Sequence, residues 1–210
     1  MYFRTEGIIL SRYNFGEADR ILKIYTKDYG KVVAIVKGVR RPRSRKAGHV
    51  EIGNWCKLFI ARGKNIDLVT EVDLKKAFGI NEFTATKANK IYHLLEIVES
   101  LTEEKQKNPS VFILLVQFLE KIAAGENFNL VSISFKVKLL SILGFFSASS
   151  FKNSKAKNIF EVIENDDFEI IKREINLKES SYLKLLQFLD SMIEKLTLKK
   201  LKTVRFLDGQ

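Results

Sequence analysis

The amino-acid sequence predicts an α+β protein in which a small five-stranded barrel is followed by an all-helical region. Between Phe3 and Phe78 the apolar residues alternate with polar ones or run briefly between turn residues, which is the pattern of β-strands. After Gly79 the apolar repeat lengthens to about 3.6 residues, the period of an α-helix. Five short strands in so short a segment are typical of a closed sheet such as the OB-fold. We therefore expect an OB-fold domain over residues 1–80 and a helical domain over residues 81–210.

The strands are predicted between turn residues. Asp28-Tyr29-Gly30 and residues 62–65 have the composition of tight turns, so each joins two neighbouring strands. The five strands are expected at residues 4–13, 20–26, 31–39, 55–62 and 66–75.

The connection after the third strand differs from the other connections. Residues 37–48 lack apolar periodicity, carry six Lys and Arg residues, and contain one proline and two glycines. Runs of like charge are solvated and repel one another. We expect this segment to be a mobile, solvated loop.

The second half of the chain contains four clear helical patterns. Residues 86–102, 110–124 and 180–196 are amphipathic, whereas residues 130–143 are apolar almost all round and predict a central, buried helix. Residues 147–157 are polar and low in complexity, and residues 159–175 fit either short strands or an irregular helix. We therefore expect residues 147–178 to be irregular.

The composition describes a basic protein. The 210 residues have a formal net charge of +11, and residues 1–78 hold 17 Lys and Arg against 8 Asp and Glu. This excess of positive charge attracts polyanions. Nucleic acid is the first polyanion to consider, and anionic lipid is the second. No run of about 18 apolar residues occurs, and charges interrupt the short apolar run near the start. We expect a cytoplasmic protein with no membrane contact.

Short motifs at the start of the chain follow one another in a characteristic order. They are TEGIIL at 5–10, GEADRIL at 16–22, Tyr25-Thr26 with Gly30, and KGVRR at 37–41 with Ser44. This order resembles the N-terminal domain of the RecO family of recombination mediators. LGF at 143–145 and residues 198–207 resemble later parts of the same family.

The resemblance implies an OB-fold followed by a helical domain, and a non-enzymatic protein of the bacterial cytoplasm and nucleoid that needs no cofactor. It implies binding of single- and double-stranded DNA, annealing of complementary strands, and loading of RecA together with RecR and single-stranded DNA-binding protein, whose acidic tail the helical domain would bind. Many members of the family hold zinc with four cysteines in the region of residues 147–178. This chain has no cysteine there, so we expect no zinc.

Candidate DNA-binding residues gather in the basic loop and near it. Arginine offers phosphate a planar two-pronged donor and lysine a point charge. Aromatic residues interleave with the charges, and most of them should fill the barrel, but Tyr29 lies in a turn where a base could stack on its ring. The predicted DNA-binding residues are Lys37, Arg40, Arg41, Arg43, Arg45, Lys46, Arg20, Lys31 and Tyr29.

Two alternative functions belong to other classes. Glu17 and Asp19 are two residues apart and could hold a hard metal ion in a nuclease, although pairing with a cation such as Arg12 or Arg20 at a turn is the simpler interpretation. A basic RNA-binding OB-fold module is the other alternative. The sequence contains one cysteine, Cys56, and two histidines, His49 and His93. We therefore expect no catalytic residues and no metal site.

Overall fold

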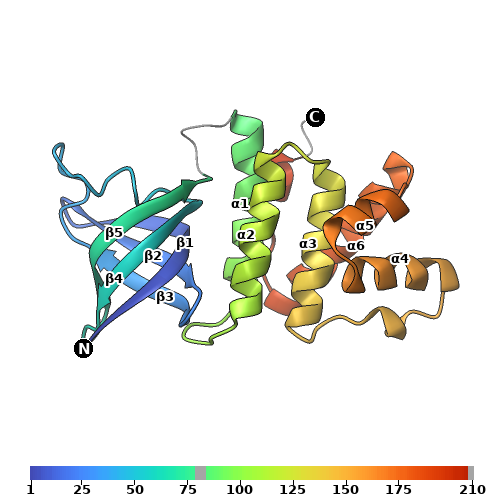
Figure 1. Cartoon of the computed structure of the whole chain (residues 1–210), viewed down its shortest axis with the longest axis horizontal. Coiled ribbons are helices and arrows are strands. Elements are labelled where there is room, and N and C mark those ends of the chain that lie inside the picture. Colours follow the sequence, from blue (N-terminus) through green and yellow to red (C-terminus); the bar gives the residue numbers. More distant parts are fainter. Residues whose placement is uncertain (79–83, 208–210) are drawn as a thin grey trace. The chain divides into compact units, whose positions relative to one another are not determined.

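The computed structural model describes residues 1–78 and 84–207, which form two compact units (Figure 1). The first unit contains residues 1–113 and the C-terminal residues from Leu201 onwards, and the second contains residues 114–200. The predicted domain boundary at residue 80 lies outside the described residues.

The first unit contains the predicted OB-fold. Its five strands close into a barrel in the order β1-β2-β3-β5-β4, in which β3 and β5 are parallel and the other neighbours antiparallel. All five predicted strands are present, with β1 longer than expected at both ends. The strands are β1 (Tyr2–Phe15), β2 (Asp19–Thr26), β3 (Gly30–Val36), β4 (Asn54–Ala61) and β5 (Asp67–Ala77).

The barrel closes because β1 pairs along its first half with β4 and along its second half with β2. A bulge between Ile9 and Ser11 lets the long strand bend between its two partners. Gly7 lies where the two pairings meet, and a Cβ atom there would come within 2.6 Å of the Ile24 side chain. Side chains of all five strands then fill the interior, which explains the alternating pattern of the sequence.

Helix α1 (Ala85–Leu101) and the C-terminal segment belong to the same unit as the barrel. The Lys23 ammonium of β2 lies 2.6 Å from the Glu99 carboxylate of α1. The Glu96 carboxylate accepts hydrogen bonds from the backbone N–H groups of Lys202 and Thr203, at 2.8 and 2.9 Å. These contacts join segments that are far apart in the sequence.

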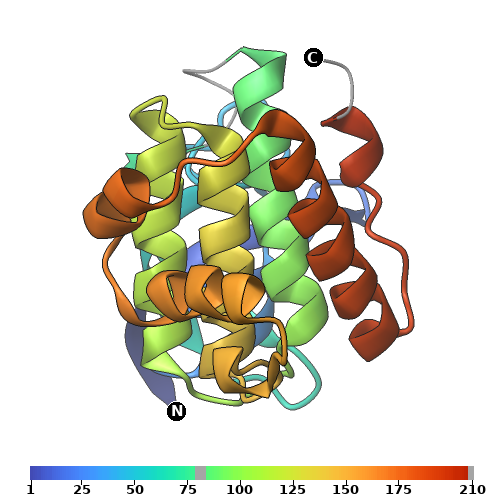
Figure 2. The same cartoon turned by 90° about the vertical axis from the view of Figure 1, so that its right-hand side faces the viewer.

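The second unit is built around α3, as its almost uniformly apolar sequence predicts. α3 contacts α4, α5 and α6, and Figure 2 shows α4 lying across it. Among the polar residues of α3, Lys136 is fully buried, and its ammonium lies 2.6 Å from the Asp190 carboxylate of α6. The helices are α2 (Pro109–Ala123), which begins in the first unit, α3 (Phe128–Ile142), α4 (Ser154–Asn165), α5 (Phe168–Glu174) and α6 (Glu179–Thr197), with short 3-10 turns η2 (Ala148–Ser150) and η3 (Val204–Phe206).

The expectation that residues 147–178 are irregular is wrong, because this region contains η2, α4 and α5. Asn153 and Asp167 cap the two helices by accepting hydrogen bonds from backbone N–H groups of the first turn. Only Phe160 and Ile163 of α4 are buried, so its apolar pattern was too sparse to indicate a helix. In the described part of the chain, no helix has the length and apolar character needed to cross a membrane.

Candidate nucleic-acid interface

The basic loop, residues 37–53, joins β3 to β4 and is anchored at both ends. Val39 and Val50 are buried in the barrel core. The Gly38 N–H donates to the Asp19 carboxylate at 2.7 Å, and the Arg40 N–H donates to the Ala18 carbonyl at 2.8 Å. The charge pattern predicted a loop, but it did not predict these anchors, which hold the loop against the β1–β2 hairpin.

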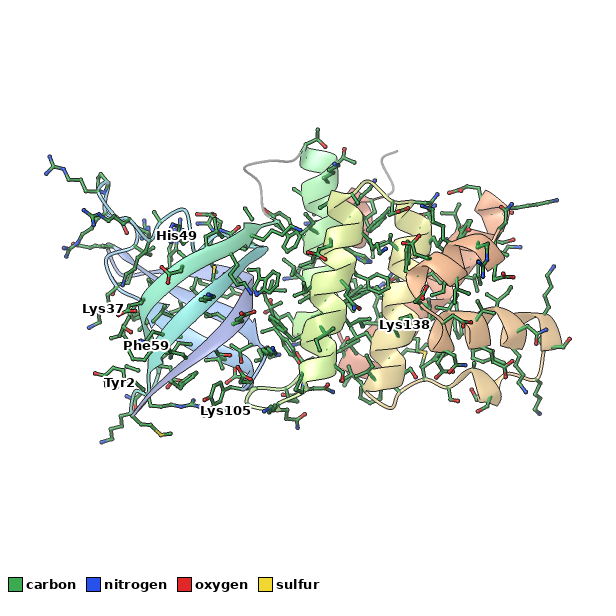
Figure 3. All side chains as sticks on the ribbon, in the orientation of Figure 1. Tyr2, Lys37, His49, Phe59, Lys105 and Lys138 are labelled. Carbon is green, nitrogen blue, oxygen red and sulfur yellow. The ribbon has the colours of Figure 1, made fainter. Side chains whose placement is uncertain are left out.

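Five of the six predicted loop cations are exposed. They are Lys37, Arg40, Arg41, Arg43 and Arg45, and Figure 3 shows Lys37 on the outside of the barrel. Lys46 is half-buried, and its ammonium donates to the Thr70 carbonyl at 2.5 Å. Lys46 therefore fastens the loop to β5, and the other five cations form the charged surface.

Arg20 lies beside the loop but is engaged in an ion pair. Glu51, near the end of the loop, lies 3.0 Å from the Arg20 guanidinium and 2.9 Å from that of Arg12. The sequence suggested Glu17 or Asp19 as the partner of these arginines, and the partner in the structure is Glu51. The pairs hold the second half of the loop against β1 and β2.

Lys31 does not belong to this surface. Its ammonium is turned inward and donates to the carbonyls of Glu99 and Thr102, at the C-terminal end of α1. The negative end of the helix dipole favours a cation there, although burial lowers the pKa of Lys31. The predicted phosphate contact of Lys31 is therefore replaced by a structural role.

Tyr29 also differs from its predicted role. The ring is half-buried against the core, with its centroid 4.3 Å from that of the Phe3 ring and 5.6 Å from the Arg62 guanidinium. A ring that already has neighbours of this kind has little free face for a base.

Most of the interleaved aromatic residues were expected to fill the barrel, but two of them are exposed. Tyr13 and Phe15, at the end of β1, are 50% and 53% exposed. The signal in the sequence was their position just before Gly16, whose φ of 55° turns the chain. Residues at the end of a hairpin lie beyond the barrel interior, so alternation alone does not bury them.

The carboxylates and the potential metal ligands are dispersed. Asp19 is engaged by Gly38, whereas Glu17 is exposed at the hairpin. Within residues 1–78 and 84–207, no three Asp, Glu, His or Cys side chains gather as a metal ion would require. The Cys56 thiol is buried and donates to the His49 carbonyl at 3.2 Å.

A second surface on the barrel has mixed charge. A groove of about 460 Å³ crosses β1, β4 and β5 next to the stacked rings of Tyr2 and Phe59, whose centroids are 5.4 Å apart (Figure 3). Four carboxylates oppose its three cations, so the groove lacks the positive field that attracts a polyanion. The cations are Arg4, Lys27 and Lys57, and the carboxylates are Glu6, Asp28, Glu71 and Asp73.

Comparison with known families finds two matching segments, one over the barrel and one over the helices that follow it. The family description "Recombination protein O N terminal" matches residues 1–78, and "Recombination protein O C terminal" matches residues 90–151. The chain belongs to the RecO family. The basic loop lies in the segment that matches the N-terminal part of RecO, and α3 lies in the segment that matches the C-terminal part.

Curated RecO proteins are similar to the chain over about two thirds of its length. One from Pelotomaculum thermopropionicum is 29% identical, over 68% of this chain and 56% of the relative. One from Moorella thermoacetica is 34% identical, and one from a Roseiflexus species is 32% identical, over 53% and 50% of their own lengths and 68% of this chain. Each is called "DNA repair protein RecO". The chain thus spans about half the length of these curated relatives.

Proposed function

We propose that the protein is a DNA-binding recombination mediator that acts in DNA repair and recombination. The observation that carries this proposal is the group of five exposed cations on a loop fastened to an OB-fold barrel. Membership of the RecO family and the name shared by the curated relatives support it.

The proposed chemistry is electrostatic. Arg and Lys side chains that neutralise phosphates release the counterions condensed on DNA, and a guanidinium can bind two phosphate oxygens at once. When phosphates on two complementary strands are neutralised together, the repulsion between the strands falls and base pairing can nucleate. Annealing of this kind has no covalent step and consumes no nucleotide, so we propose a protein that is not an enzyme and needs no cofactor.

The proposed partners follow from the same role. The protein would act with RecR to help load RecA onto DNA coated by single-stranded DNA-binding protein. An acidic tail that ends in an aromatic residue requires apolar side chains near cations. Phe188 of α6 is 44% exposed, and Lys184, four residues before it on the same face of the helix, is exposed. We therefore propose that the tail binds the helical unit.

The basic loop is tested by replacing its five exposed cations, Lys37, Arg40, Arg41, Arg43 and Arg45, with glutamine. Each change should alter the free energy of unfolding by less than about 0.5 kcal/mol, because the side chains are exposed. Affinity for single-stranded DNA should fall greatly. The slope of log K against log salt should flatten by up to roughly 3.5, since each phosphate neutralised contributes about 0.7.

A matched control makes the same change in charge elsewhere in the first unit. Glutamine would replace the exposed lysines Lys27, Lys57, Lys64, Lys105 and Lys107. Binding measured by fluorescence anisotropy across a salt series should then change much less than in the loop variant. Equal losses in the two variants would mean that net charge alone, and not the loop, binds DNA.

Strand annealing tests the activity itself. Complementary oligonucleotides, bare or coated with single-stranded DNA-binding protein, are mixed with the full chain in the presence of EDTA and without ATP. Faster annealing is expected on both substrates, and failure on both would overturn the proposal. Preference for structured RNA of equal length, or cleavage of DNA when magnesium is added, would instead favour an RNA-binding module or a nuclease.

A further inference from the structure

We propose that Phe15 and Tyr13, at the tip of the β1–β2 hairpin, form a platform on which unpaired bases stack beside the basic loop. The inference rests on the proposed function and deepens it, because it states which form of DNA the site selects. The loop would hold phosphates of any DNA, and the platform would add affinity for single strands alone.

The exposure of the two rings is the first observation. Tyr25 and Phe78 of the same unit are fully buried, whereas Tyr13 and Phe15 are 50% and 53% exposed. Two residues apart on a strand, they lie on the same side of β1. The Lys23 ammonium lies 5.6 Å from the Tyr13 ring centroid, so Phe15 is the less engaged of the two rings.

The loop docks directly on this hairpin. The Arg40 guanidinium donates to the Gly16 carbonyl at 3.1 Å, and Gly16 follows Phe15 in the chain. Backbone hydrogen bonds from Gly38 and Arg40 reach Asp19 and Ala18 on the other arm of the turn. The loop cation Arg40 and the two exposed rings therefore lie at the same end of the β1–β2 hairpin.

Charge complementarity identifies the occupant and its orientation. The loop presents five cations, but Glu17 at the hairpin tip is exposed and repels phosphate. The phosphates should therefore lie over the loop and the bases over the rings. Every base has a face that can stack on an aromatic ring, but in a duplex those faces already stack on neighbouring bases. The platform therefore discriminates by strandedness and tolerates any base sequence.

The experiment compares the full chain with its Phe15→Ala, Tyr13→Ala double variant. The double variant should bind single-stranded DNA more weakly, by roughly 5- to 150-fold as expected for the loss of one stacked base. It should bind a duplex of equal length as the unchanged protein does. Its salt slope should stay unchanged, since no phosphate contact is lost. Quenching of 2-aminopurine in the bound strand should also disappear.

Two controls keep the inference separate from folding and from the proposed function. Tyr2→Ala removes a ring that is 62% exposed at the other end of β1 and should leave both affinities unchanged. Phe15→Trp should preserve single-strand binding. If the double variant binds single strands normally while the loop variant does not, the platform is wrong and the proposed function stands. An equal loss for single strands and duplex would also overturn the platform.

Discussion

A basic side chain can bind DNA only if its charged group is exposed and is not already held by other groups of the protein. Lys31 and Lys37 look alike in the sequence, but Lys31 is buried with its ammonium on two carbonyls of α1, whereas Lys37 is exposed. Arg20 is intermediate, since it is paired with Glu51 at the edge of the proposed interface. The proposed interface therefore includes only some of the basic residues of the first unit.

Lys31→Met tests the structural role of this residue. The change removes both hydrogen bonds to the end of α1 and leaves the carbonyls of Glu99 and Thr102 without their donor. Unsatisfied buried groups cost about 1–3 kcal/mol, so urea denaturation should show a loss of this size. DNA affinity under native conditions should not change. Lys27→Met, at an exposed position nearby, should affect neither quantity, and a selective loss of DNA affinity in Lys31→Met would contradict the structural role.

Cys56 offers a test of barrel closure. Burial raises the pKa of its thiol from 9.0 to about 12, so the native protein should react slowly with iodoacetamide at pH 8, and the protein in denaturant should react fast. The folded-state pKa is the higher one, so the unfolded chain loses its proton first. The contribution of Cys56 to stability should therefore decrease as the pH rises above about 9. Rapid labelling of the native protein would mean that the barrel opens at β4.

Among the secondary-structure elements, an aromatic cluster lies close to residues 147–178, the region in which many RecO proteins have their zinc-binding cysteines. The rings of Phe146, Phe151 and Phe160 lie 4.7 to 5.5 Å apart between centroids, and Phe188 of α6 lies 6.0 and 6.3 Å from those of Phe151 and Phe160. Aromatic rings in such arrangements stabilise a core beyond the area that they bury. The cluster joins η2, α4 and α6.

Phe160→Ala should therefore destabilise the helical unit by about 3–5 kcal/mol, as expected when a buried phenylalanine is truncated. Phe145→Ala, at a side chain that is 46% exposed, is the matched control and should have a small effect. EDTA should leave the melting temperature of the unchanged protein as it is, because the chain has one cysteine and two histidines. One zinc ion per chain by elemental analysis would contradict this prediction.

At the scale of the whole molecule, residues 1–80 should bind DNA by themselves, because they contain both the basic loop and the hairpin. The fragment should nevertheless be less stable than the full chain, since Lys31 and Lys23 lose their partners on α1. Circular dichroism melts and DNA binding of the two proteins check this. A folded fragment with no DNA affinity would remove the barrel from the proposed function. Binding of the acidic tail should require the remainder of the chain.

Elements with a strong local period could be predicted from the sequence. The five strands, the central helix α3 and the basic loop were predictable because alternation, a continuous apolar face and a run of charges are properties of neighbouring residues. The helices α4 and α5 were not predictable in this way. Their ends are set by the caps Asn153 and Asp167, and α4 buries only Phe160 and Ile163, so the local apolar signal is weak.

The side chains that form the candidate interface depend on tertiary contacts and could not be predicted from the local sequence. Glu51 pairs with Arg12 and Arg20 across more than 30 positions of sequence, and α1 takes up the Lys31 ammonium. The end of β1 extends past the barrel core and leaves Phe15 exposed beside Arg40. These outcomes depend on which distant segments come into contact when the barrel closes. The residues next to a charged or aromatic side chain in the sequence do not specify those contacts.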